Sequence, residues 1–478
     1  MRVFLALILI AAGWTAFAQP ETLDRSTAED AIDEQAFLAW VIAHHPLAKR
    51  AALLNDEAAA YLQKARGAFD PKLSAGTYRK LFGDETYYDM PALGVDIPTR
   101  LGIQPFAEFL NPAGTQLNPE RKVPADGQVA AGIRIPLGKN LLTDAARTEL
   151  AKARAYATAN EAERALQLNQ LMLDAAEAYW KWWKASATVD LTLEALALSQ
   201  WRADQIRNAF TLGDQAAIDT LEAGLLAQQR AAEQLQAEAD LAYARNNALR
   251  FLWREDGLPA APNANLRPID PDSSQLETTA ALLLMDAVQW RAVDHPMFQA
   301  GSAKLDMAAA DVRFRRDQLK PQIDLSVAML TGTDGPGDWD LSRESLSSNH
   351  LIGAKVSVPL LLRKERGNLN LAQIDQERQR FELQDKLAKL EASVNGLRDG
   401  LPALFASSNL AAEVAVGTRE LLDAETTRLS FGESSLFKVN YRENQWIKSR
   451  KEAIERRAEW AMGVRALGFA MGGRNQGD

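Results

Sequence analysis

Four segments of the chain alternate apolar and polar residues. Three are regular, at Gln128–Leu137, Gln322–Leu330 and Leu351–Leu360, and a fourth, at Lys72–Phe82, is less so. Period two with one apolar face predicts β-strands. About ten residues is also the length of a tilted strand in a membrane barrel, whose wall is apolar outside and polar inside. A soluble antiparallel sheet has the same alternation, so the pattern alone leaves both open.

Two other tracts have helical spacing. Thr143–Leu212 is long enough for one helix of about 100 Å. After a break at Gly213, apolar residues three and four positions apart predict a second helix over Ala216–Trp253. This spacing favours left-handed coiled-coil packing. The predicted seam consists of Leu221, Leu225, Ala232, Leu235, Ala239, Ala242, Leu249 and Trp253, with Gln228 and Asn246 in the remaining positions.

The prolines separate these elements. Ten of the 19 lie between Pro20 and Pro136, and none lies between Leu137 and Leu258. Because proline costs about 3 kcal/mol inside a helix, long helices are expected in the proline-free tracts. Four prolines lie at the ends of predicted strands and mark strand–helix junctions: Pro71, Pro136, Pro321 and Pro359. Pro402 lies within the second long helical tract and predicts a kink there.

Several short motifs recur in the same order, which indicates an internal duplication. His45-Pro46 recurs as His295-Pro296, each typical of a helix start, and the Ile-Pro-Leu of Ile135–Leu137 recurs as Val358–Leu360. The predicted organisation is a signal peptide at 1–18, a first repeat at 19–254, a proline-rich linker at 255–275 and a second repeat at 276–478. Each repeat has helix, strand, loop, strand and a long helical hairpin, so the fold class is α+β.

The N-terminus has the features of an export signal. A basic Arg2 precedes an apolar run from Val3 to Gly13, and Ala16 and Ala18 supply the small residues of a cleavage site. An N-terminal membrane anchor is the alternative, but the run is too short to span about 30 Å of hydrocarbon as a helix.

Composition excludes several classes of protein. The 478-residue chain has a net charge of −9 without a basic cluster, which argues against nucleic-acid binding. It has no cysteine, which excludes disulfides, thiolate metal sites and attachment of lipid to an N-terminal cysteine. No phosphate-binding glycine loop, metal-ligand spacing or catalytic triad is found, so we expect no catalytic residues, no metal and no cofactor. The aromatic run Tyr179–Trp183 is expected to pack in a helical core or between subunits, rather than to form a platform for a ligand.

The signal peptide, the duplicated strand pairs and the turns Leu212-Gly213-Asp214 and Phe431-Gly432-Glu433 together resemble the TolC-like outer-membrane efflux protein family (outer membrane factors). The resemblance covers essentially all of the mature chain. It implies a homotrimer in the cell outer membrane, with four strands per chain forming a twelve-stranded barrel that continues as an α-helical coiled-coil barrel into the periplasm. It also implies two kinds of partner, a periplasmic membrane-fusion (adaptor) protein and an inner-membrane pump or ABC-type transporter.

The resemblance assigns positions to this sequence. It places the periplasmic tips, which would contact the adaptor, at Asn208–Asp219 and Arg428–Val439, and the outer loops at Gly83–Asp126 and Thr331–Asn349. Arg134, Asp324 and Lys355 alternate onto the predicted barrel lumen. The family's acidic pore constriction is replaced here by Lys438 and Tyr441, although the first repeat keeps Asp219 at the equivalent place. The first outer loop is also unusually long.

The sequence therefore predicts a passive exit duct of a tripartite efflux or type I secretion system, opened by its periplasmic partners and not an enzyme. The alternative is a periplasmic coiled-coil scaffold or adaptor in which the alternating segments form a soluble sheet. Membrane fractionation separates the two. The cargo, whether drug, metal or protein, is not specified by the sequence.

Overall fold

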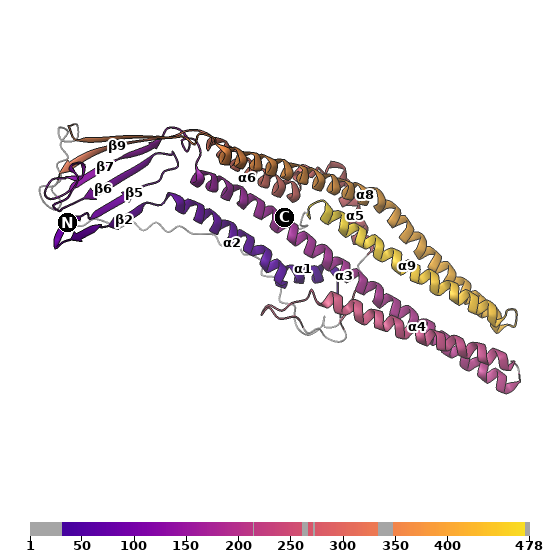
Figure 1. Cartoon of the computed structure of the whole chain (residues 1–478). Helices are drawn as coiled ribbons and strands as arrows, with labels where there is room; N and C mark the ends of the chain where they lie inside the picture. Colours follow the sequence, from indigo (N-terminus) through magenta and orange to yellow (C-terminus); the bar gives the residue numbers. More distant parts are fainter. Residues whose placement is uncertain (1–30, 214, 261–265, 271–272, 333–347, 474–478) are drawn as a thin grey trace, which may run out of the picture.

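The computed structural model describes residues 31–213, 215–260, 266–270, 273–332 and 348–473. The predicted signal peptide lies outside these residues. The molecule is elongated, with a curved β-sheet at one end and two helical hairpins at the other (Figure 1). Within the described residues, no helix combines the length and the apolar character needed to cross a membrane.

The two predicted hairpins are present. Helix α3 (Ala145–Leu212) is followed by α4 (Ala217–Leu249), and α8 (Arg363–Ser430) by α9 (Leu436–Ala470). Helices α3 and α8 have 68 residues each, which corresponds to about 100 Å. The Asp144 carboxylate caps α3 by accepting a 2.7 Å hydrogen bond from the Arg147 amide. Helix α8 continues through Pro402.

Four shorter helices precede these hairpins in pairs: α1 (Glu34–His44), α2 (Pro46–Arg66), α5 (Ser273–Gln289) and α6 (Pro296–Asp317). Helices α2 and α6 both begin with proline at the first position. In both, the preceding histidine accepts a hydrogen bond from a backbone amide, His45 from Leu47 and His295 from Met297. The predicted helix starts at the two His-Pro motifs are thus confirmed. Two single 3-10 turns (Gly67–Phe69 and Ala292–Asp294) and the parallel pair β1 (Ala31–Ile32) and β8 (Arg267–Pro268) complete the helical part, and a third 3-10 turn (Pro119–Arg121) lies between strands of the sheet.

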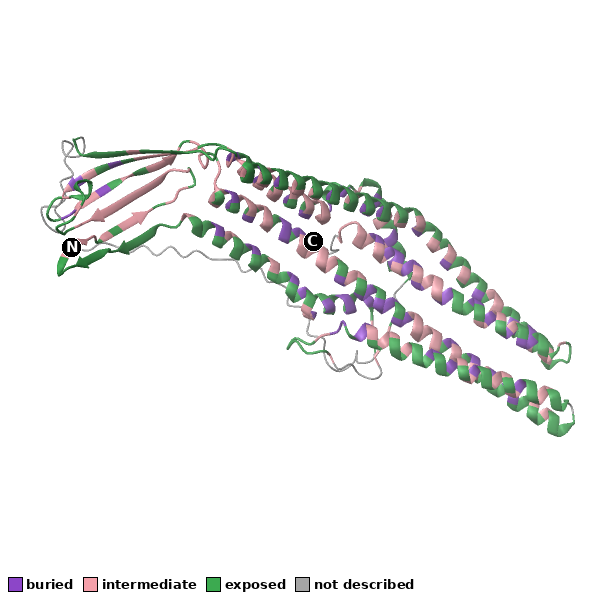
Figure 2. Cartoon of the chain, viewed as in Figure 1, coloured by how far each residue is buried: buried purple, intermediate pink, exposed green. Residues whose placement is uncertain are grey.

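The helices form a curved layer with two free sides. Towards the tips the packing order is α4, α3, α9, α8, and towards the sheet it is α2, α3, α6, α8. Helix α8 therefore borders one side along its whole length, while α2 and α4 border the other. Burial follows this order, because buried residues concentrate on the inner helices and α8 is largely exposed (Figure 2).

The core lies at mid-length, where α1 packs on α3 and α5 packs on α9. Tyr179, Trp180 and Trp182 are almost completely buried, and the Tyr179 hydroxyl lies 3.0 and 2.8 Å from the carbonyl oxygens of Ile32 and Ile269. Burial raises the pKa of this phenol. The aromatic run is therefore part of the core, as predicted.

The sheet differs from the prediction in its number of strands. Six strands pair antiparallel in the order β10, β9, β7, β6, β5, β2. Their bounds are Lys72–Gly76 (β2), Ala92–Asp96 (β5), Gln104–Leu110 (β6), Gln128–Pro136 (β7), Gln322–Gly332 (β9) and His350–Ser357 (β10). A separate hairpin consists of β3 (Arg79–Phe82) and β4 (Glu85–Asp89).

The prediction of four strands per chain is thus wrong, and 83–126 is not simply an outer loop. The Lys72–Phe82 segment divides into β2 and β3, and the supposed loop contains β4, β5 and β6. Two features hid β5 and β6 from the sequence pattern. Strand β5 has only five residues, and β6 carries Pro105 and Phe106 side by side, so neither shows a long alternation.

The predicted seam of α4 is also misplaced within the single chain. All its positions from Leu221 to Asn246 are exposed, and of its remaining positions Leu249 is buried. The other residues of α4 that are buried are Ala223, Arg230, Gln234, Ala237 and Ala248. The intramolecular seam of this hairpin is built from small and polar residues, which gave no apolar signal. Three larger apolar residues of the predicted seam, Leu221, Leu225 and Leu235, face outward.

Candidate functional site

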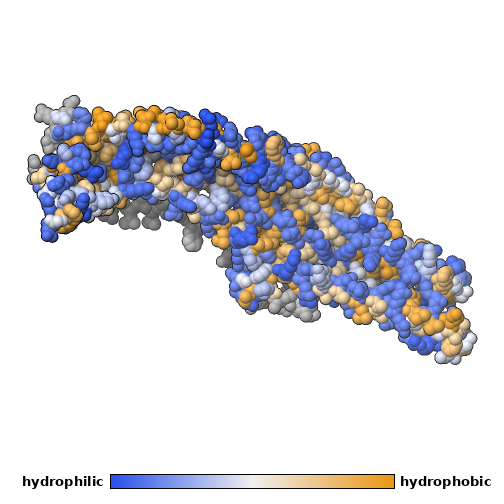
Figure 3. Space-filling model, in the orientation of Figure 1, coloured by the Kyte–Doolittle hydropathy of each residue, from blue (hydrophilic) through white to orange (hydrophobic). Residues whose placement is uncertain are grey.

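The register of the sheet separates its residues onto two faces. Cross-strand partners share a face, and residues two apart on a strand share it as well. We call one the apolar face. It carries Leu73, Leu93, Val95, Ala107, Phe109, Val129, Ile133, Ile135, Ile323, Leu325, Val327, Met329, Ile352 and Val356. Leu73, Ile352 and Val356 are 76%, 63% and 67% exposed. An orange band in Figure 3 follows the sheet where β9 and β10 run.

The opposite, polar face carries the residues predicted to line the lumen. Lys355 pairs with Asp324 in register, and Arg134 pairs with Ser326, two residues further along β9. The Gln322 amide donates to Asp324 at 2.7 Å. Arg134 forms an ion pair with Asp96 of β5, and its guanidinium lies 4.0 Å from the centre of the Phe106 ring. The three predicted residues therefore lie on one face, together with charged partners from strands that the sequence pattern missed.

The four predicted junction prolines lie at or near strand ends. Pro71 precedes β2, Pro136 ends β7, Pro321 precedes β9, and Pro359 follows β10. Beside Pro321, a Cβ on Gly138 would lie 1.9 Å from the Pro321 carbonyl oxygen, so only glycine fits there.

The buried Asp317 joins the two halves of the chain at this level. Its carboxylate accepts 2.6 Å hydrogen bonds from the Asn140 amide and from Lys320. The junction between helices and sheet is therefore held by buried polar contacts and by close backbone packing at Gly138.

At the other end of the molecule, each hairpin turns on a glycine with positive φ. Gly213 has a φ of +87° and Gly432 a φ of +74°, backbone conformations that residues other than glycine rarely adopt. Leu212 and Phe431, next to these glycines, are 78% and 75% exposed. The Glu433 amide donates to the Arg428 carbonyl at 2.9 Å, which closes the second turn. Asp214, the remaining predicted tip residue, lies outside the described residues.

In the part of the chain that the structure describes, Lys438, Tyr441 and the related Asp219 form no hydrogen bond or ion pair with one another. Asp219 lies in the first turn of α4, where its carboxylate accepts from the Ala216 amide at 3.3 Å, a capping interaction. Tyr441 is half exposed and accepts a 2.7 Å hydrogen bond from Gln445. Lys438 lies in the first turn of α9, and its positive charge attracts the Glu425 carboxylate.

Glu425 is a residue that sequence reasoning missed. It lies near the end of α8, almost buried, and accepts a 2.5 Å hydrogen bond from the Ser434 hydroxyl across the turn. That hydrogen bond, together with the charges of Arg428, Lys438 and Arg442, holds the pKa of Glu425 below its usual range. A single carboxylate thus ties the end of α8 to the start of α9.

A second missed group lies further from the tips, where α3, α4 and α9 meet. Glu443 is completely buried, and its carboxylate lies 2.5 Å from the Arg202 guanidinium and 3.6 Å from that of Arg230. Arg202 also donates to Asn440 at 3.0 Å, and Arg230 pairs with Glu233 at 2.7 Å. The two hairpins are therefore linked through a buried arginine–glutamate–arginine triad.

A weak signal for this triad was present in the sequence. Arg230 lies seven residues from both Ala223 and Ala237, so it occupies a core position of the α4 heptad. A charged residue at such a position is expected to have a buried partner. The partners came from helices far away in the sequence, and their identity was not readable from spacing.

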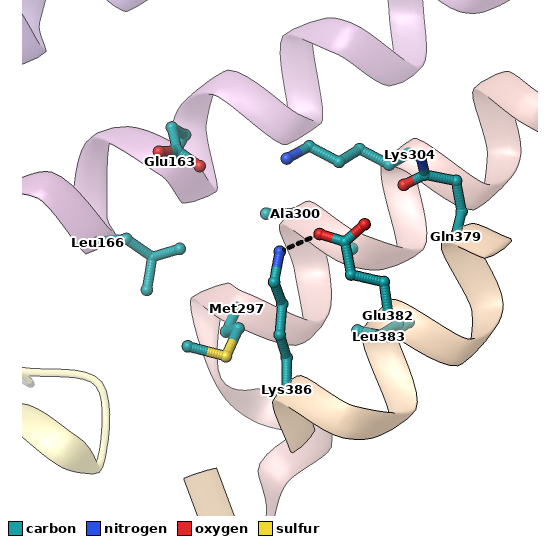
Figure 4. A pocket seen from close by; sticks show the side chains of 10 residues that line it. Glu163, Leu166, Met297, Ala300, Lys304, Gln379, Glu382, Leu383 and Lys386 are labelled. Carbon is teal, nitrogen blue, oxygen red and sulfur yellow. Dashed lines mark hydrogen bonds and ion pairs between the residues drawn. The ribbon is translucent and has the colours of Figure 1, made fainter. Parts of the chain in front are cut away.

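A small cavity of about 50 Å³ lies among α3, α6 and α8 (Figure 4). Among the residues that line it, Glu382 and Lys386 form an ion pair at 2.6 Å. Leu383 packs against Gly301 so closely that a Cβ on this glycine would lie 2.4 Å from the Leu383 side chain. A space of this size holds little more than water, so it is a packing defect rather than a ligand site. No cluster of three or more potential metal ligands occurs among the residues described.

Comparison with known proteins gives the following matches. Residues 291–473 match the family described as outer membrane efflux protein. Among solved structures, the chain is similar to the outer membrane protein VceC of Vibrio cholerae, with a TM-score of 0.63 and 16% identity over 92% of this chain and 96% of that one.

It is also similar to the CmeC outer membrane channel of Campylobacter jejuni, with a TM-score of 0.62 and 14% identity over 93% and 87% of the two chains. For the MtrE outer membrane channel of Neisseria gonorrhoeae in its open state, the TM-score is 0.61 with 16% identity over 92% and 89%. Comparison with curated protein sequences gives no match. These findings confirm the resemblance and the α+β fold.

Proposed function

We propose that this chain, a relative of the outer membrane efflux proteins through residues 291–473 and through a fold shared with VceC, CmeC and MtrE, is an outer-membrane exit duct. Several copies assemble into a tube whose sheet end lies in the outer membrane and whose helical end extends into the periplasm. The tube is a passive conduit that performs no chemistry, and its cargo is moved by partners.

The observation that carries this proposal is a pair of unpartnered apolar stripes on the two free sides of the helical layer. The α4 stripe is the outward-facing set Leu221, Leu225, Gln228, Ala232, Leu235, Ala239 and Ala242. The α8 stripe is the outward-facing set Leu410, Val414, Gly417, Leu421 and Ala424, of which the three larger residues are about half exposed. Both alternate at three and four residues, which is the pattern of a coiled-coil seam.

We propose that the α4 stripe of one copy packs against the α8 stripe of a second copy. The two lie on opposite sides of one chain, so pairing α4 of one copy with α8 of the next is heterologous, and such contacts generate rings when the rotation closes. The sheet is open on the same two sides as the helical layer. Its edge strand β2 follows α2 in the chain, and its other edge strand β10 is followed by α8. One operation therefore closes the helical layer and the sheet together. The number of copies, three, follows from the resemblance.

The two faces of the sheet fit this assembly. In a closed ring the apolar face meets the lipid of the outer membrane, and the polar face, with Arg134, Asp324 and Lys355, lines the lumen. A soluble sheet would need a cover for the apolar face, and no described helix packs on it. The proposal therefore takes precedence over a periplasmic scaffold without a membrane domain.

The tips are the proposed contact for a periplasmic adaptor, beyond which lies an inner-membrane pump or transporter. Both turns present an exposed apolar residue beside a glycine, Leu212 at Gly213 and Phe431 at Gly432. Near the tips, each chain is held together by Glu425 and by the buried triad of Glu443, and Lys438 and Tyr441 are the residues we assign to the constriction.

The repeated order of helix pair, strands and hairpin also supports the proposal that the chain is an internal duplication, with repeats at 19–254 and 276–478 joined by 255–275. Export through the signal peptide 1–18 brings the chain to the periplasm. Neither repeat is expected to be stable alone, since α3 packs against α6 and α9 of the other repeat.

The proposal is tested by fractionation, mass and conductance. The protein should be found in the outer-membrane fraction, migrate as an oligomer until boiled, have the mass of three chains in native mass spectrometry, and form channels in planar bilayers. A monomer in the periplasmic fraction would contradict the proposal and favour the scaffold.

A further inference from the structure

We infer that each chain contributes six strands to the membrane barrel, so that three chains form a barrel of eighteen strands rather than twelve. The two additional strands are β5 and β6, which lie inside the segment between β2 and β7. This inference rests on the proposed membrane assembly and adds to it a wider pore.

The first argument is the pairing. In the register, Ser74 of β2 is opposite Gly94 of β5, Gly94 is opposite Glu108 of β6, and Glu108 is opposite Ala130 of β7. The β5–β6 hairpin is thus hydrogen-bonded on both sides and separates β2 from β7. A lid or plug folded over the lumen would leave β2 and β7 as neighbours.

The second argument is the alternation along the hairpin. Its side chains on the apolar face are Leu93, Val95, Pro105, Ala107 and Phe109, and those on the polar face are Ala92, Gly94, Asp96, Gln104, Phe106, Glu108 and Leu110. All three charged or amide side chains therefore lie on the face of Arg134, Asp324 and Lys355. This is the pattern required of a wall that separates lipid from water.

The third argument is the position of the hairpin turn. Residues 97–103 connect β5 to β6 at the end of the sheet nearest the helices. There the Arg100 guanidinium lies 5.9 Å from the centre of the Phe69 ring, and Gly102, with φ of +82°, lies against Arg147 in the first turn of α3. The hairpin therefore extends to the strand–helix junction at the inner end of the sheet.

The consequence is a wider exit. Barrel diameter grows roughly in proportion to strand number, and barrels of 16–18 strands enclose an aqueous channel. The new strands also bring Asp96 and Glu108 to the lumen, and Asp96 pairs with Arg134. The polar lining of the outer-membrane exit is therefore richer in carboxylates than four strands would make it.

The test uses the absence of cysteine from the chain, which allows cysteines to be placed at will. The first pair is Ser74→Cys with Gly94→Cys, which the register places opposite one another and within disulfide range. The matched pair is Ser74→Cys with Ala130→Cys, in the same cross-strand row but three strand spacings apart, about 14 Å. In intact membranes, oxidation should link the first pair and leave the second unlinked.

Single cysteines give a second, independent measurement. Cysteines at Val95 and Phe109 should be at least tenfold slower to react with a charged, membrane-impermeant thiol reagent than cysteines at Asp96 and Glu108. A fluorophore on the first two should be quenched by brominated lipid.

Cysteines at Ile133 and Arg134 of β7 serve as the reference for the two faces. Outer-membrane fractionation and the boiling-sensitive oligomer are recorded for every variant. An inserted oligomer that links Ser74 to Ala130, or shows equal reactivity on both faces of β5 and β6, would overturn the six-strand wall and leave the proposed channel standing. A soluble protein would overturn both.

Discussion

At the scale of single residues, the least expected feature is the burial of three charges between the hairpins. Glu443 is fully buried between Arg202 and Arg230, which are themselves almost buried. Removing one member of a buried ionic group leaves an uncompensated charge and costs about 3–5 kcal/mol, whereas replacing the whole group by apolar residues is often neutral. The triad therefore makes the packing of α9 against α3 and α4 depend strongly on one carboxylate.

The substitution Glu443→Gln removes the negative charge and keeps the shape. It should lower the stability of the helical domain by about 3 kcal/mol, because two buried guanidinium groups lose their counter-charge. Thermal unfolding followed by circular dichroism measures this. Asp385→Asn removes an exposed pairing with Lys389 and should change stability by less than about 1 kcal/mol. Equal effects of the two substitutions would contradict the role of the triad.

Glu425 makes the turn between α8 and α9 sensitive to acid. Its native pKa lies below the ordinary value of 4.5, so the carboxylate contributes stability that is present above that value and lost as the pH falls through the native pKa. Amide hydrogen exchange across 428–438, corrected for intrinsic rates, should therefore accelerate below pH 4.5. Glu425→Gln should show the faster exchange already at pH 7. Exchange that is unchanged in this variant would refute the assignment.

Residues that act locally were predictable, and residues that act through distant partners were not. The His-Pro helix starts and the Asp144 position follow from rules that span three or four residues. Glu443, Arg202 and Arg230 come from three helices, and nothing in their immediate neighbours distinguishes them from solvated charges.

At the scale of elements, the proline-free tract of the first repeat predicted α3 and α4 within a few residues of their ends, whereas the second long helical tract was expected without exact bounds and α8 continues through Pro402. The strands were harder to identify, because β5 has five residues and β6 starts with Gln104-Pro105. Only the pairing partners on either side make these segments strands, and pairing is not a local property. For the same reason, the α4 pattern predicted a coiled-coil seam without showing which helix would pack against it.

The two tip glycines support a prediction about function at this scale. Gly213→Val and Gly432→Val place a β-branched residue at positive φ, which costs roughly 1–3 kcal/mol. Each should reduce export while leaving membrane insertion intact, as measured by export assays beside the boiling-sensitive oligomer. Gly224→Ala, in the interior of α4 with open space around it, is the matched control and should export normally. Normal export by both valine variants would argue against the tips as the functional ends.

At the scale of the whole molecule, several surfaces of the single chain have no partner within that chain. The α4 and α8 stripes, the apolar face of the sheet and the free strands β2 and β10 all lack partners in the described residues. The stripes and the free strands lie along two sides that run the length of the molecule. A ring of copies pairs the stripes and the free strands with one another and turns the apolar face towards lipid, which explains why exposed leucines follow a regular period.

This arrangement predicts a charge-dependent assembly. Leu225 lies 12 residues after Gly213 and Leu421 lies 11 residues before Gly432, so the two lie at the same level when the tips of neighbouring copies are aligned. Leu225→Glu would bury an unpaired carboxylate in the seam and should convert the oligomer to monomers, measured by native mass spectrometry. Adding Leu421→Lys to the same chain should restore the oligomer by pairing the charges across the seam. Tyr243→Glu, at a position of α4 that is more exposed than Leu225 and is not part of the stripe, should leave assembly unchanged. If Leu225→Glu assembles as well as Tyr243→Glu does, the two stripes do not meet.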